Sequence, residues 1–214
     1  MRRVWRALAS GRHVVLSARY GMGRTALMRR IAEVHGHEMP FAFADLSTGS
    51  GEASRSIYGA LGGRPGARPG GLGYRTVRHR LLHELGEEGE PCALVLDEIM
   101  RLTPPRLKLV GDLALARRFR IVAVVAAHMP EAEQESLRRR LNGPEVVSLG
   151  RLKPRDVREF LRRASAAHGF AWSEEDVEAR VPGVGGYPTW MVATVENELR
   201  RRRRGFMGSV VMSD

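Results

Sequence analysis

Two uninterrupted runs of apolar residues, at 93–96 and 121–127, constrain the fold of this chain more than any other feature. Strands that are buried on both faces have this composition, and they occur in parallel sheets that helices cover on both sides. Further strands are expected at 13–17, 41–46 and 146–149, and segments with helical spacing separate them. Strands that alternate with helices predict an α/β fold built on a five-stranded parallel sheet.

Helices are expected between these strands, and the pattern changes after Gly150. Before that point helices are predicted at 4–9, 25–35, 52–61, 74–86, 104–118 and 131–141, with a flexible glycine- and proline-rich loop at 62–73. After it, helices predicted at 154–168, 173–180 and 187–203 follow one another without a strand. We therefore expect an α/β core over residues 1–150, a small helical lid over 151–204 and a tail over 205–214.

Composition argues against a membrane protein and a disulfide scaffold. The chain has no apolar run of about 18 residues, which a membrane-spanning helix needs. Its first residues lack the apolar core and cleavage site of a secretory signal. Cys92 is the single cysteine, so no internal disulfide can form, and a buried small residue is expected there rather than a nucleophile. These features favour a cytoplasmic protein with no membrane partner.

The glycine loop Ala18–Thr25 lies between a predicted strand and a predicted helix, which is the context of a phosphate-binding loop. Gly21 and Gly23 allow backbone N–H groups to turn toward an anion, and the helix that follows points its positive end at the same place. The Thr25 hydroxyl is expected to bind Mg²⁺. The predicted nucleotide contacts in this loop are Ala18, Arg19, Tyr20, Gly21, Met22, Gly23, Arg24, Thr25 and Ala26.

An acidic pair, Asp97 and Glu98, ends the apolar strand that begins at residue 93. An aspartate at the tip of such a strand can reach the Mg²⁺ ion, and an adjacent glutamate can polarise an attacking water. A glycine turn followed by a helix-capping acidic pair is the structural alternative. The loop and the pair together, in this order, predict a site for a nucleoside triphosphate and Mg²⁺.

The loop resembles the Walker A motif, G-x-x-x-x-G-K-[ST], and residues 95–98 resemble a Walker B motif with its catalytic glutamate. The chain is similar to AAA+ P-loop ATPases of the compact type found in transposition target selection (TniB-like), in ExeA-like secretion and in origin recognition. The resemblance implies a sheet order of 5-1-4-3-2, ATP and Mg²⁺ as cofactors, and a homo-oligomer. Ala18 replaces the first glycine of the motif and Arg24 its lysine, so the pocket is expected to bind ATP but to hydrolyse it slowly, if at all.

The resemblance also implies roles for weaker positions. His128 follows the fourth strand, where the family has a polar sensor of the γ-phosphate, although a lone histidine at a strand end is as often a surface residue. Arg140, within the run 138–140, stands where the family presents an arginine finger to a neighbouring subunit, and a solvated basic face is the alternative. The turn at 183–188 resembles the family's G-G-x-P, but no sensor arginine follows it.

The net charge of +11 predicts a phosphate-bearing partner. Two groups of arginines are candidate contacts for the phosphates of duplex DNA without sequence preference. One group shares a helix face, and the other ends the last helix. They are Arg155, Arg158 and Arg162, and Arg200, Arg201, Arg202, Arg203 and Arg204. A solvated charged surface is the alternative reading.

Three functions fit these observations. The first is an ATP-binding AAA+ protein, a slow ATPase, that assembles on DNA and regulates or recruits a recombinase- or transposase-type partner. The second is a nucleotide-dependent signalling or defence switch resembling the STAND ATPases. The third is a nucleotide-bound scaffold that does not hydrolyse ATP, which Arg24 favours.

Overall fold

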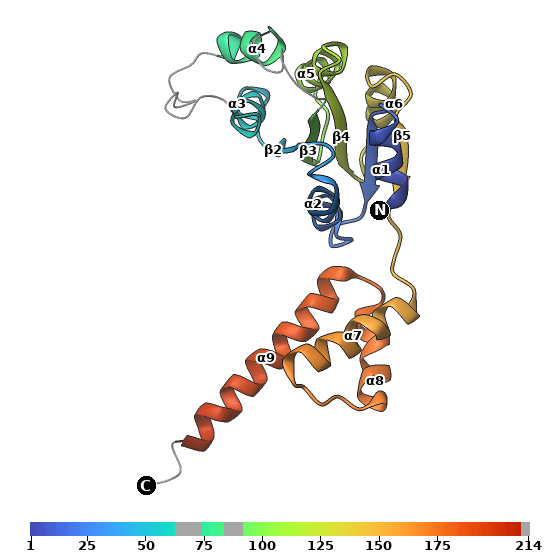
Figure 1. Ribbon diagram of the computed structural model, residues 1–214, viewed down its shortest axis with the longest axis vertical. Helices are drawn as coiled ribbons and strands as arrows, with labels where there is room; N and C mark the ends of the chain where they lie inside the picture. Colours follow the sequence, from blue (N-terminus) through green and yellow to red (C-terminus); the bar gives the residue numbers. More distant parts are fainter. Residues whose placement is uncertain (63–73, 84–91, 211–214) are drawn as a thin grey trace. The chain divides into compact units, whose positions relative to one another are not determined.

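The computed structural model describes residues 1–62, 74–83 and 92–210 (Figure 1). It divides the chain into two compact units. The first comprises Met1–Arg19 and Arg24–Leu149, and the second comprises Tyr20–Gly23 and Gly150–Asp214. The predicted loop at 62–73 lies outside the described residues except for Gly62, as does the end of the helix predicted at 74–86.

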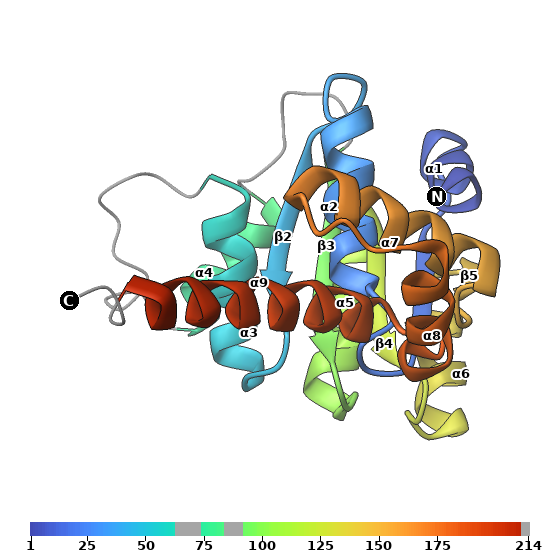
Figure 2. The same ribbon diagram turned by 90° about the horizontal axis from the view of Figure 1, so that it is seen from below.

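The first unit contains a five-stranded sheet with the order β2-β3-β4-β1-β5, in which every strand pair is parallel. The order confirms the predicted 5-1-4-3-2, and β2, β3, β4 and β5 can be followed across the sheet in Figure 2. The strands are β1 (Val14–Ala18), β2 (Phe41–Asp45), β3 (Cys92–Ile99), β4 (Phe119–Ala126) and β5 (Glu145–Ser148).

Helices cover both faces of this sheet, which explains the uninterrupted apolar runs. On β4, Ile121, Ala123 and Val125 pack into one hydrophobic cluster, whereas Val122 and Val124 pack into the other. Residues of α1 and α2 belong to the second of these clusters, and residues of α3, α4, α5 and α6 to the first. The helices are α1 (Arg2–Ala9), α2 (Arg24–His35), α3 (Ser50–Ala60), α4 (Tyr74–His83), α5 (Pro104–Leu115) and α6 (Glu131–Arg140).

The junction of α5 and β4 differs from the sequence prediction. Helix α5 ends at Leu115 rather than at residue 118, because Arg117 takes a left-handed conformation with φ of 55° that ends the helix. Strand β4 then begins at Phe119, two residues before the apolar run that predicted it. Phe119 is buried and pairs with Cys92, so the half-buried Arg120 belongs to the strand.

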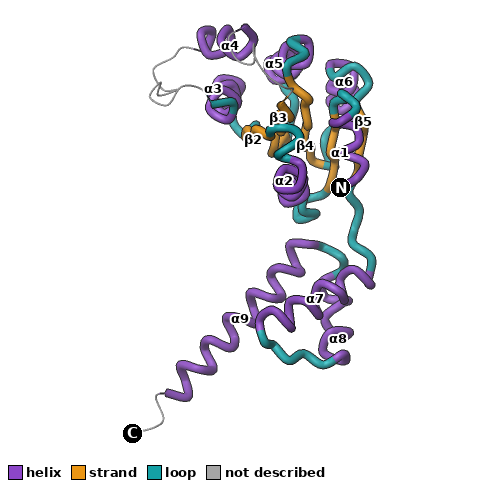
Figure 3. Tube along the Cα trace, viewed as in Figure 1, coloured by secondary structure: helices purple, strands orange, loops and turns teal. Residues whose placement is uncertain are grey.

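The second unit contains the helices α7 (Pro154–His168), α8 (Glu174–Val184) and α9 (Pro188–Val210), and no strand among its described residues (Figure 3). Its core is Val157, Leu161, Val177, Val184 and Met191. Helix α8 starts at a capping box formed by Ser173 and Asp176. It continues past the predicted end at residue 180, with Pro182 inside it, and burial of Val184 in the core accounts for the extra turn.

Among the described residues no helix combines the length and the apolar composition that crossing a membrane requires. Cys92 is half-buried at the start of β3, and burial raises the pKa of its thiol above the ordinary value. Its side chain packs against the core cluster, as expected for a small structural residue rather than a nucleophile.

Candidate functional site

The carboxyl ends of β1, β3 and β4 lie at one edge of the sheet because these neighbouring strands run parallel. Ala18 ends β1 opposite Ala126 of β4, and the carbonyl of Ala18 accepts a hydrogen bond of 3.0 Å from the N–H of Ala127. His128 follows directly and is exposed. Ligands of open α/β sheets bind at this edge, so the fold places the predicted loop, the acidic pair and His128 where a ligand is expected.

The two predicted Mg²⁺ ligands are in contact. The Thr25 hydroxyl donates a hydrogen bond of 2.7 Å to a carboxylate oxygen of Asp97. Asp97 is 9% exposed, and its other oxygen accepts a hydrogen bond of 2.8 Å from the backbone N–H of Glu98. Residues 72 positions apart in the sequence therefore form one pair of oxygen donors.

Glu98 occupies a bulge in β3. The pairing register with β4 shifts between Leu96 and Ile99, and Glu98 has a positive φ of 56°. A residue other than glycine in this region costs of order 1–3 kcal/mol, and such strain is found preferentially at functional sites. The bulge interrupts the regular alternation of side chains between the two faces of β3 at Asp97 and the half-buried Glu98.

Arg24 is the first residue of α2 and is only 7% exposed. Its Nη1 atom is buried and has no hydrogen-bond partner among the described residues. A buried guanidinium N–H without an acceptor is costly, since it has lost water and gained nothing in return. An anionic oxygen from a ligand would satisfy this donor, so the observed environment fits a bound phosphate.

The loop between β1 and α2 has the backbone of a glycine turn. Gly21 and Gly23 have φ of 79° and 76°, a region that side chains with a Cβ rarely adopt. Residues 20–23 belong to the second compact unit. Of the other predicted contacts in the loop, Arg19 and Ala26 are exposed.

The metal ligands expected here are few. Within the described ranges, no group of three or more His, Cys, Asp or Glu side chains is placed to hold a metal ion. Mg²⁺ in phosphate sites is held by one or two protein oxygens, with phosphates and water completing its shell. The contact between Thr25 and Asp97 supplies two such oxygens. The residues therefore fit Mg²⁺ bound together with a phosphate.

Arg140 does not join these residues within its own subunit. It is exposed at the end of α6, and its Cδ lies 3.0 Å from the position that a Cβ on Gly111 would take. It lines a hollow at the opposite, amino-terminal edge of the sheet. Its predicted action on the nucleotide of a neighbouring subunit stays a prediction.

That hollow, of about 810 Å³, is a basic site that sequence reasoning missed. We call it the arginine pocket, and its basic lining residues are Arg12, His13, Arg117, Arg120, Arg139 and Arg140. They come from separate segments, before β1, at the start of β4 and before β5. The sequence shows Arg139 and Arg140 as part of a basic run, but it does not show that Arg12, Arg117 and Arg120 join them. The sequence feature that could have indicated the pocket is that arginines precede three of the predicted strands, β1, β4 and β5.

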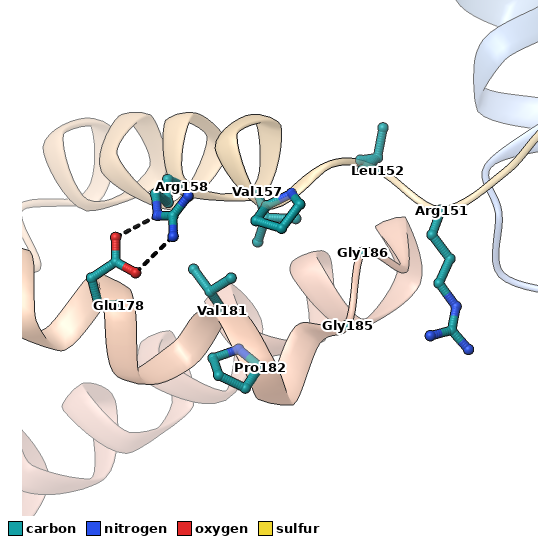
Figure 4. Close-up of a pocket in the computed structure, with 10 residues that line it drawn as sticks. Arg151, Leu152, Val157, Arg158, Glu178, Val181, Pro182, Gly185 and Gly186 are labelled. Carbon is teal, nitrogen blue, oxygen red and sulfur yellow. Dashed lines mark hydrogen bonds and ion pairs between the residues drawn. The ribbon is translucent and has the colours of Figure 1, made fainter.

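The predicted arginine stripe on α7 faces acidic residues of α8. Arg158 donates hydrogen bonds to both carboxylate oxygens of Glu178, one of them 3.0 Å long, beside a hollow of about 460 Å³ (Figure 4). Arg162 contacts Glu174 in the same forked manner. These hydrogen bonds hold the pKa of each glutamate below its ordinary value. Arg155 pairs with Asp156 at 3.3 Å.

The arginine run on α9 is partly paired as well. Arg201 and Arg202 donate to the same carboxylate, that of Glu198, which is 7% exposed, and Arg202 also bonds the carbonyl of Gly169 at 3.0 Å. Arg200 contacts Glu196 at 3.6 Å. Arg203 and Arg204 are exposed and have no ion pair with any residue that the structure describes.

No protein-family model matches the sequence, and no curated protein matches it. The ORC2 protein of Aeropyrum pernix in its ADP form matches with a TM-score of 0.62 and 17% identity, over 97% of this chain and 62% of that one. The chain has the fold of a P-loop ATPase. A RuvB mutant of Thermotoga maritima matches with a TM-score of 0.60 and 15% identity, over 91% and 60% of the two chains.

A third solved structure with a similar fold is the ORC1 protein of Aeropyrum pernix in complex with DNA. It matches with a TM-score of 0.54 and 17% identity, over 94% of this chain and 65% of that one. The chain thus spans less than two thirds of the length of each of these structures. At such identities the likeness establishes the fold, and the function must be argued from the site.

Proposed function

We propose that this chain is a P-loop protein of the AAA+ type that binds ATP together with Mg²⁺ and hydrolyses ATP slowly. The observation that carries the proposal is the contact between Thr25 and Asp97 beside the buried, unpartnered Arg24 at the carboxyl edge of the sheet. Oxygen donors for the metal and a charged donor for phosphate belong to one small region of the fold.

Each residue has a defined task in this proposal. Thr25 and Asp97 hold Mg²⁺, which neutralises phosphate charge when bound. Arg24 donates its free N–H to phosphate oxygen, and Glu98 accepts a proton from the attacking water. A planar guanidinium replaces the compact ammonium of the usual lysine, so the charge stabilisation of the transition state is weaker and turnover is slow. His128, exposed beyond β4, contacts the same phosphate.

The proposal extends to DNA and to assembly. The chain has a net charge of +11, and one solved structure of the same fold is a complex with DNA. We propose that subunits assemble on duplex DNA without sequence preference and regulate or recruit a recombinase-type protein partner. Arg140 then serves the nucleotide of a neighbouring subunit. Arg24 favours one alternative, a nucleotide-bound scaffold without hydrolysis.

Thermal melting with and without Mg²⁺ and ATP tests the site. A ligand that binds only the folded state stabilises it by about 2.7 kcal/mol at 100 times Kd. Thr25→Ala and Asp97→Ala are expected to remove most of the ATP-dependent shift. Asp45→Ala is the matched control, because Asp45 ends the neighbouring strand β2 in register with Asp97. Equal shifts in all three variants and the parent protein would reject the site.

A further inference from the structure

The arginine pocket lies at the amino-terminal edge of the sheet, opposite the edge that carries Thr25 and Asp97. Gly11, Arg12 and His13 precede β1, Arg117 and Arg120 stand at the start of β4, and residues 139–143 precede β5. Strand β1 has five residues, so the two edges are separated by about 17 Å along it at ~3.3 Å per residue. The pocket is therefore distinct from the proposed ATP site.

Two glycines make room for arginines of the pocket. A Cβ on Gly11, which has φ of 79°, would lie 3.4 to 3.6 Å from three guanidinium atoms of Arg120. A Cβ on the buried Gly111 would lie 3.0 Å from the Cδ of Arg140, which is closer than most real Cβ contacts. Glycine at these two positions therefore leaves space that the side chains of Arg120 and Arg140 occupy.

The charge of the pocket is largely uncompensated. Arg12 pairs with Glu145 at 2.9 Å, and Glu145 also contacts Arg3. The other four arginines of the pocket have no carboxylate partner among the described residues. This differs from the arginines of α7 and α8, which pair with acidic residues. Like charges gathered in one pocket repel one another, so a bound anion would stabilise it.

His13 adds a neutral donor. Its Nδ1 accepts a hydrogen bond of 3.0 Å from the N–H of Ile121, so Nε2 carries the proton of the neutral ring. Burial, together with the charge of Arg120, holds the pKa of His13 below its ordinary value. The pocket therefore combines guanidinium forks with an imidazole N–H, and all of these groups suit phosphate oxygens.

The lining also indicates which part of a ligand is recognised. Among the described residues no Phe, Tyr or Trp lines the pocket, and its larger apolar residues are Leu115 and Leu141. Recognition of single-stranded bases normally uses aromatic stacking, so the pocket is suited to phosphates rather than to bases. A hollow of about 810 Å³ has room for a drug-sized ligand, and one phosphate would leave most of its arginines without an acceptor.

We propose that the arginine pocket binds successive phosphates of a nucleic-acid backbone, independently of sequence. The proposal deepens the DNA-binding part of the proposed function and does not depend on ATP. Arg12, Arg117 and Arg139 are all exposed, so a strand that crosses the pocket reaches them without opening the fold. Each arginine that neutralises a phosphate releases counterions and strengthens binding at low salt.

The test combines Arg117→Asn with Arg139→Gln. Both side chains are exposed and lack a carboxylate partner, and asparagine tolerates the left-handed backbone of Arg117. Arg140 is left intact, so its proposed role toward a neighbouring nucleotide is not disturbed. The matched control combines Arg30→Gln with Arg163→Gln, which removes the same charge from exposed arginines outside the pocket. Fluorescence anisotropy measures binding of a 20-base-pair duplex and of the same length of single strand across a salt series.

The expected result is a weaker affinity in the pocket variant alone. Loss of two phosphate contacts lowers the slope of log affinity against log salt by about 1.8 on duplex DNA, and affinity at 0.1 M salt by roughly 60-fold. The control variant should change neither slope nor affinity to this extent. Unchanged slope and affinity in the pocket variant, with DNA bound by the parent protein, would overturn the proposal and leave DNA binding intact.

A second measurement separates failure of the pocket from failure of DNA binding. Tripolyphosphate is added during thermal melting to the parent protein and to both variants, each already saturated with ATP and Mg²⁺ so that the proposed ATP site does not contribute. One outcome is a melting shift in the parent and control proteins but not in the pocket variant, with no DNA binding by any of them. The pocket would then be a site for small polyphosphates, and the proposal that it binds nucleic acid would be wrong. Absence of both the tripolyphosphate shift and DNA binding would overturn the pocket as a phosphate site.

Discussion

Replacing Arg24 with methionine separates a ligand-binding residue from a structural one. The substitution keeps an unbranched stem in α2 and removes the charge and the unpartnered buried N–H. A buried donor without a partner costs about 1–3 kcal/mol, and more when it is charged. Without ligand, Arg24→Met should therefore leave the free energy of unfolding unchanged or raise it by about that amount, which is unusual for a buried residue.

When ATP is bound, Arg24→Met is expected to lose this gain in stability. A hydrogen bond to a charged group contributes about 1.5–3 kcal/mol, so its loss should weaken ATP binding by about 10- to 150-fold. Thermal melting detects both effects, because 1 kcal/mol shifts Tm by about 2–4 °C in a chain of this size. Calorimetric titration with ATP and Mg²⁺ gives the affinity directly.

Arg29→Met is the matched control for this experiment. Arg29 lies on the same helix, five positions further on, and is exposed. The control should change neither Tm nor the ATP affinity appreciably, since surface substitutions usually fall within about 0.5 kcal/mol. A fall of several degrees in Arg24→Met without ligand, with the ATP-dependent shift retained, would show that Arg24 serves the fold and not the phosphate.

Four further substitutions test catalysis at the proposed ATP site and the stability of the second unit. Glu98→Gln should lower ATP turnover by about 10²–10⁴-fold with binding retained, and turnover that survives in a phosphate-release assay would remove Glu98 from this role. Arg24→Lys should raise turnover; an equal or lower rate would show a pocket adapted to arginine. Gly186→Ala should destabilise the second unit by about 1–3 kcal/mol in denaturant titrations. The φ of Gly186 is 76°, and a Cβ there would lie 2.5 Å from a backbone carbonyl oxygen. The control Gly183→Ala should have no such effect, because nothing lies within 4 Å of its Cβ position. Hydrogen bonds from Arg201 and Arg202 lower the pKa of Glu198 in the folded protein. These hydrogen bonds therefore stabilise the fold fully above the unfolded pKa of ~4.3, and this stabilisation is lost as pH falls through the folded pKa. Melting curves at pH 6 and pH 3 should therefore differ less in Glu198→Gln than in the parent protein.

The strands were predictable because burial on both faces leaves a direct mark on composition. The run at 121–127 identified β4, but it missed Phe119 and Arg120, because one charged residue interrupts the pattern. Whether Arg120 stands in a strand or a turn depends on pairing with β3, which is a property of the fold and not of the segment. The sheet order came from the resemblance to a family, since apolar runs carry no information on which strands are neighbours.

In the candidate site, too, some features were predictable from the sequence and others were not. The loop and the acidic pair were visible as short motifs. The contact of Thr25 with Asp97 follows from the parallel sheet, in which the carboxyl ends of β1 and β3 lie at one edge on either side of β4. The orphaned N–H of Arg24 was not predictable, because burial of one atom depends on everything packed around it. The bulge at Glu98 was equally hidden, since a strand's sequence does not record a shift in its pairing register.

Net charge is a coarse guide to which arginines lack a carboxylate partner. Helical spacing placed Arg158 and Arg162 on one face, but Glu174 and Glu178 are spaced by four on α8 and meet both of them. Exposed pairs of this kind contribute only about 0–1 kcal/mol, so phosphate can replace the carboxylates, although the released glutamates then repel it.

Arginines 201 and 202 pose a different difficulty, because their shared partner Glu198 is almost fully buried. Deleting the run after Leu199 would leave this carboxylate without either arginine, so the helix itself would be destabilised. Loss of DNA binding in such a truncated chain would therefore not identify phosphate contacts. Substituting an arginine that has no carboxylate partner tests phosphate binding with the least effect on the stability of the fold. Four such arginines line the pocket at the amino-terminal edge of the sheet.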